Sequence, residues 1–98
     1  MQNTPKYLDD AFESVCNEIT DLFIKKHHDY GKENILDIEE LGIAFRSSEK
    51  IARLKNLLKE NKTPKNESFE ETWKDIAVYA IIAILYRRGW FQKLGMKS

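Results

Sequence analysis

The sequence has little of what marks several common classes of protein. Cys16 is the single cysteine, which excludes a disulfide framework and a zinc site built from several cysteines. Sixteen Lys and Arg residues balance sixteen Asp and Glu residues, so no net charge draws the chain to nucleic acid or anionic lipid. The longest apolar run, residues 76–86, is about half of a membrane span. We therefore expect neither nucleic acid nor a membrane as a partner.

The composition is typical of a single folded domain. Apolar residues make up 42% of the 98 residues and charged residues 33%, which is too hydrophobic for a disordered chain. A chain of this length forms one core, so residues 1–98 are expected to be a single helical domain. Nothing at residues 1–4 resembles a signal peptide, and we expect an intracellular location.

The spacing of apolar residues predicts three helices, over about residues 5–27, 44–60 and 67–88, and no strands. Thr4 and Pro5 favour the start of the first helix, whose apolar stripe includes Cys16, expected in the core. A short irregular segment should end near Gly42, before the second helix. Ser68 and Glu71 have the spacing of a capping box at the start of the third helix, and Gly89 should end that helix. The predicted fold is an all-α, three-helix, hairpin-like bundle.

The helix over residues 67–88 is apolar on every face between residues 76 and 86. A three-helix bundle in water should leave one side of each helix polar. We therefore expect the protein to assemble into a homo-oligomer through this helix, with Ile82 as an interface residue.

Two charged stripes of opposite sign are the most informative pattern for function. The helix over 44–60 carries a basic stripe of Arg46, Lys50 and Arg53. The helix over 67–88 carries an acidic row of Glu67, Glu71 and Asp75. In an antiparallel hairpin, Lys50 lies near Asp75 and Arg53 near Glu71. One interpretation is structural, with interhelical salt bridges beside a core. The other is a polar site where basic groups hold phosphate and carboxylates hold ribose hydroxyls, base amino groups or a divalent ion.

Four short segments, taken in order, resemble a known family. They are residues 26–31 (KHHDYG), 50–54 (KIARL), 67–68 (ES) and 75–80 (DIAVYA), which together span most of the chain. The set resembles the phage and bacterial nucleotide-modification-associated domain family, type one, which is distantly similar to the MazG-like, all-α nucleoside triphosphate pyrophosphohydrolases. The resemblance implies a small phage or prophage protein of the bacterial cytoplasm that acts in nucleotide metabolism.

The resemblance also directs attention to particular residues. It carries over Asp29, Lys50, Arg53, Glu67, Glu71 and Asp75, and the helix spacing and aromatic character add Tyr30, Arg46 and Tyr79 as further candidate ligand-binding residues. The expected ligand is a nucleotide or nucleotide-derived signal, which the protein would hold or sequester in phage–host conflict or nucleotide modification.

A hydrolase of this kind needs magnesium held by carboxylates from two helices. The helix over 44–60 offers only Glu49 on its central turns, and basic or hydroxyl side chains stand where a second ligand belongs. If Mg²⁺ binds, Glu71 and Asp75 are the expected ligands. We therefore expect binding rather than catalysis. A magnesium-dependent pyrophosphohydrolase and a structural oligomerisation module are the alternatives.

Overall fold

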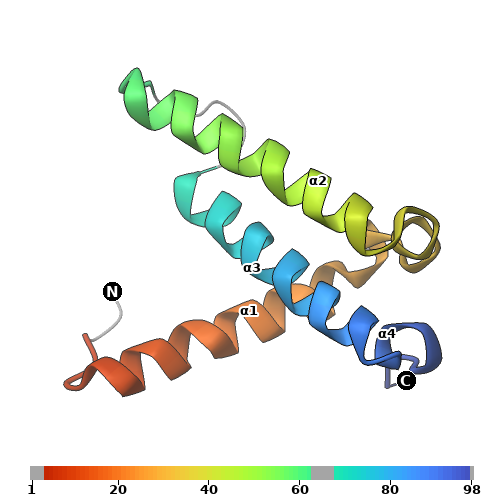
Figure 1. Ribbon diagram of the computed structural model, residues 1–98. Coiled ribbons are helices and arrows are strands. Elements are labelled where there is room, and N and C mark those ends of the chain that lie inside the picture. Colours follow the sequence, from red (N-terminus) through yellow and green to blue (C-terminus); the bar gives the residue numbers. More distant parts are fainter. Residues whose placement is uncertain (1–3, 63–67, 98) are drawn as a thin grey trace.

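The structure, a computed structural model, describes residues 4–62 and 68–97, with only the backbone described at 28–30. The described residues form helices and no strands (Figure 1). The helices are α1 (Leu8–Tyr30), α2 (Lys32–Lys59), α3 (Phe69–Arg87) and the short α4 (Trp90–Lys93). The predicted all-α fold with three long helices is confirmed. Within the described residues, no helix has the length and apolar character needed to cross a membrane.

Helix α3 is the central element of the bundle. It runs antiparallel to α2 on one side, while the second half of α1 crosses it on the other side and α4 folds back at its end (Figure 1). Ile35 and Ile43 of α2 form the buried core with Val78 and Ile82 of α3. Because α1, α2 and α4 all pack against α3, much of the apolar surface found on every side of α3 is explained by contacts within one chain. Because Ile82 is fully buried in this core, the prediction that it faces a second copy of the chain is wrong.

The start and end of α3 follow the sequence signals. The Oγ of Ser68 accepts a hydrogen bond of 3.0 Å from the backbone N–H of Glu71, which caps the first turn. Gly89 follows the helix with φ of 75°, a left-handed conformation that glycine adopts without steric cost. Both predicted signals are confirmed.

Helix α2 begins much earlier than predicted. It starts at Lys32 rather than near residue 44, and its interruption lies at Glu39, with φ of 58° and ψ of −170°, rather than near Gly42. The early segment is helical because it buries Ile35 completely against α3. This stabilisation comes from packing between helices, which the spacing of apolar residues within the segment does not reveal. Helix α1, in contrast, begins at Leu8, several residues after Pro5.

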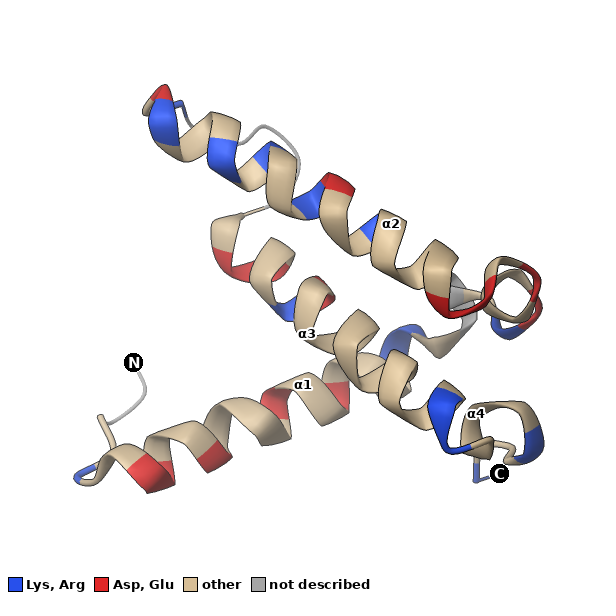
Figure 2. Cartoon of the chain, viewed as in Figure 1, with Lys and Arg blue, Asp and Glu red and all other residues tan. Residues whose placement is uncertain are grey.

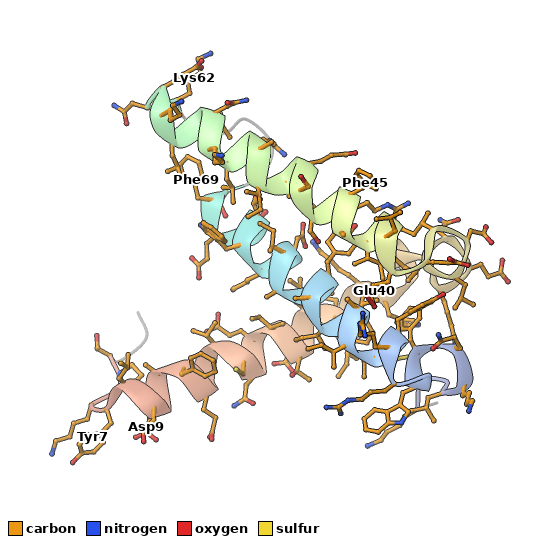
Figure 3. All side chains as sticks on the ribbon, in the orientation of Figure 1. Tyr7, Asp9, Glu40, Phe45, Lys62 and Phe69 are labelled. Carbon is orange, nitrogen blue, oxygen red and sulfur yellow. The ribbon has the colours of Figure 1, made fainter. Side chains whose placement is uncertain are left out.

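The first half of α1 extends away from the bundle. Leu8, Phe12 and Val15 are 86%, 72% and 47% exposed, although they continue the stripe that packs against α3 further along the helix. Cys16 is also exposed, so its predicted place in the core is wrong. In Figure 3 the side chains around the labelled Tyr7 and Asp9 lie far from α2 and α3. The apolar stripe predicted the face correctly, but within one chain its first half has no described element to pack against.

Candidate functional site

The two charged stripes meet across the α2–α3 hairpin. The Nζ of Lys50 donates a hydrogen bond of 3.2 Å to Oδ2 of Asp75, and both side chains are about three-quarters buried. The predicted proximity of Lys50 and Asp75 is therefore confirmed. No salt bridge between Arg53 and Glu71 is present within the described residues. Figure 2 shows that basic residues gather on the half of α2 that ends at Lys59.

The other predicted site residues occupy different surroundings. Arg46 lies on α2 one turn before Lys50 and is half-buried. Tyr79 packs against the core and lines a separate groove of about 350 Å³ between α2 and α3. Asp29 and Tyr30 end α1, where only the backbone is described, and Glu67 lies outside the described residues. The structure thus joins Lys50 to Asp75, while placing Tyr79 in another groove.

A groove lined mainly by charged residues lies between α1 and α3, and it contains part of the predicted acidic row. Its volume is about 340 Å³, near the lower end of the range for small-molecule sites. Helix α3 contributes Glu71, Lys74 and Asp75. Helix α1 contributes Glu18, Asp21, Leu22, Lys25 and Lys26. Charged side chains of both signs therefore face one another across the groove.

Lys74 connects the two walls of this groove. Its Nζ lies 3.0 Å from Oε1 of Glu18 on α1 and 3.7 Å from Oε1 of Glu70 on its own helix. The hydrogen bond to Glu18 is the main reason that the pKa of Lys74 is raised above its ordinary value, and the nearby negative charges add to it. This polar contact holds α1 against α3 beside the apolar crossing.

Four other charged side chains of the groove are available to a ligand. Within the described part of the chain, Lys25 and Lys26 form no salt bridge, and neither do Asp21 and Glu71. All four are exposed. The groove therefore presents two ammonium groups that can hold an anion and two carboxylates that can accept hydrogen bonds.

Sequence reasoning missed the α1 wall of this groove, although a signal for it exists. Glu18, Asp21 and Lys25 are spaced by three and four residues, so they share one face of α1. This charged face lies beside the apolar stripe of α1. In the same way, the basic stripe of α2 lies beside the apolar face of that helix. The spacing does not show which face of α3 it meets, because α1 crosses α3 only through its second half.

The described side chains do not form a ready metal site. Among residues 4–27, 31–62 and 68–97, no three His, Cys, Asp or Glu side chains are close enough to hold one metal ion. Glu71 and Asp75 line the same groove as Glu18 and Asp21, but Lys74 already binds Glu18 there.

Comparisons with models of protein families, with curated proteins and with solved structures gave no match. The function therefore has to be inferred from the groove itself.

Proposed function

We propose that the protein binds a nucleotide or a nucleotide-derived small molecule in the groove between α1 and α3. The observation that supports this most strongly is the pair Lys25 and Lys26, which form no salt bridge with a described carboxylate, on the wall of a groove of about 340 Å³. An ammonium group donates charge-assisted hydrogen bonds to phosphate oxygens. The two lysines would hold the phosphate groups of the ligand.

The carboxylates of the groove suit the remainder of a nucleotide. Asp21 and Glu71 accept hydrogen bonds but donate none when ionised, as ribose hydroxyls and base amino groups require. Asp75 lines the same groove and is held from α2 by Lys50 at 3.2 Å. In this arrangement Lys50 positions Asp75, and Glu71 and Asp75 keep the ligand-binding role that the acidic row suggests.

A binding protein of this kind fits the sequence resemblance. It would act in the bacterial cytoplasm as a phage or prophage protein that holds a nucleotide during its modification or sequesters a nucleotide signal. Such a role needs a selective binding site, and it does not need a complete set of metal ligands.

A magnesium-dependent nucleoside triphosphate pyrophosphohydrolase is the second candidate. It is favoured by one observation, that Glu18 and Asp21 of α1 and Glu71 and Asp75 of α3 line one groove from two helices. Magnesium would have to compete with Lys74 for Glu18 and draw the carboxylates closer together. We therefore favour binding over hydrolysis.

Ligand recovery and a turnover assay together distinguish these candidates. Purified protein is incubated with a mixture of nucleotides and Mg²⁺, and both the solution and the heat-released ligand are analysed. Binding predicts an intact nucleotide released by heat and no pyrophosphate in solution. Formation of pyrophosphate supports the hydrolase. If neither is found, both proposals fail, and a structural oligomerisation module is the remaining function.

A further inference from the structure

A single copy of the chain is less compact than a stable monomer of its size. Its accessible surface is 8058 Å², whereas a folded monomer of 98 residues exposes about 5,800 Å². Its radius of gyration is 15.2 Å, compared with about 12.6 Å for a compact domain of this length. The excess surface, on the order of 2,000 Å², is larger than the roughly 800 Å² that each partner buries in a standard interface.

Part of the exposed apolar surface belongs to the first half of α1. We name Leu8, Phe12 and Val15, which lie on one face of α1 and are largely exposed, the α1 stripe. A soluble helix rarely leaves a continuous apolar stripe in water without a partner. A partner surface must therefore be apolar and elongated.

The same chain carries a surface of that description on the other side of the helix crossing. Two adjoining apolar cavities of about 170 and 100 Å³ share Phe23 and Leu85 as lining residues. The smaller one extends along α1 and α3 to Ile19 and Ile81, and the larger one reaches Trp90, the first residue of α4. Together they form one apolar groove, which we name the crossing groove.

We propose that the occupant of the crossing groove is the α1 stripe of a second copy of this chain, and that the exchange is reciprocal. The two α1 helices then run antiparallel about a two-fold axis that passes between residues 17 and 18. In this register Phe12 of one copy faces Phe23 of the other, and Leu8 faces His27, which lines the larger cavity. The contact is isologous, so each copy fills its partner's groove and its own stripe is covered.

The charges of the chain complement this arrangement. Residues 1–23 carry a net charge of −4, and residues 87–98 carry +4. The antiparallel register brings the acidic first turn of α1, with Asp9 and Asp10, to the end of the partner's groove. Arg88 of the second copy lies at that end, against the ring of Trp90, which lines the larger cavity. Opposite charges at the rim favour this orientation over a parallel one.

Sedimentation velocity without added nucleotide tests this proposal independently of the proposed function. Wild-type protein at micromolar concentration should sediment as a dimer. Phe12→Asp should weaken dimerisation by about 30-fold or more, because it places a charge in the apolar groove. Phe45→Asp is the matched control, since Phe45 is also an exposed phenylalanine but points away from α3 on the outer face of α2 (Figure 3). Both variants should keep wild-type helicity by circular dichroism.

Two results would overturn the proposal. One is a wild-type monomer at micromolar concentration. The other is a Phe12→Asp variant that dimerises as strongly as Phe45→Asp, which would place the interface on another surface.

The single cysteine reports the orientation of the helices. In the proposed register the two Cys16 residues are offset by three helical positions, or about 4.5 Å along the paired helices. A short bismaleimide should therefore link wild-type chains through Cys16 into a covalent dimer, and it should link Phe12→Asp chains poorly. A wild-type dimer that resists this cross-link would exclude the antiparallel α1 pair.

Discussion

Glu39 interrupts α2 in a conformation that should cost the protein stability. Its φ of 58° and ψ of −170° lie in a region that glycine alone occupies without strain. For a residue with a Cβ atom this conformation costs on the order of 1–3 kcal/mol. Glycine has no Cβ, but it loses more backbone entropy on folding, which costs about 0.5–1 kcal/mol. The balance predicts that Glu39→Gly stabilises the protein by about 1 kcal/mol.

This sign is opposite to the usual effect of glycine within a helix. Glu49→Gly is the control, because Glu49 is exposed in the regular part of the same helix, where glycine should cost about 1 kcal/mol. The assay is urea unfolding at one fixed protein concentration, which keeps the contribution of self-association to the midpoint the same for all variants. Glu39→Gly should raise the midpoint by roughly 0.5–1 M at an unchanged slope, and Glu49→Gly should lower it. If both glycine variants lower the midpoint equally, Glu39 has an ordinary helical conformation and the reasoning fails.

Three further predictions concern the core, the close packing at Gly42 within α2, and the α1–α3 contact. Ile82→Ala should lower the free energy of unfolding by about 2–5 kcal/mol in denaturant titration, because Ile82 is fully buried, and a cost below 1 kcal/mol would contradict its burial. Gly42→Ala should lower it by about 1–3 kcal/mol, because the added Cβ would meet the side chain of Ile38, and an unchanged midpoint would argue against this close packing. Because the pKa of Lys74 is raised in the folded protein, its stabilising contribution is complete below the ordinary value of 10.5 and disappears as pH rises through the folded pKa. Lys74→Met should therefore be less stable than wild type near neutral pH, with the difference shrinking at high pH; a difference independent of pH would contradict the ionic contact.

Local signals in the sequence predict the ends of α3 and one contact across the hairpin. Ser68 caps α3, Gly89 follows it, and Lys50 binds Asp75, because each depends only on short-range spacing or on the register of an antiparallel pair. The beginning of α2 depends on a tertiary gain. Ile35 is buried against α3, and this burial favours a helix at the start of α2. The sequence suggests an irregular segment there because the segment lies between Gly31 and Gly42.

Periodicity identifies the face of a helix but not the element that covers it. The stripe of α1 therefore predicted burial for Cys16, although the helix extends past the end of its contact with α3. The same limit applies to the candidate site. The acidic row of α3 is visible in the sequence, whereas its meeting with Lys25 and Lys26 depends on the angle at which α1 crosses.

Calorimetric titration of a nucleoside triphosphate into three proteins tests the proposed site most directly. The proteins are wild type, the double variant Lys25→Gln/Lys26→Gln, and the control Lys55→Gln/Lys59→Gln, which removes two exposed lysines from α2. The proposal predicts that the groove variant loses about 1.5–3 kcal/mol of binding free energy per phosphate-holding lysine, while its helicity is unchanged. The control should bind like wild type apart from a small general charge effect. Equal affinities for the groove variant and the control would contradict nucleotide binding between α1 and α3.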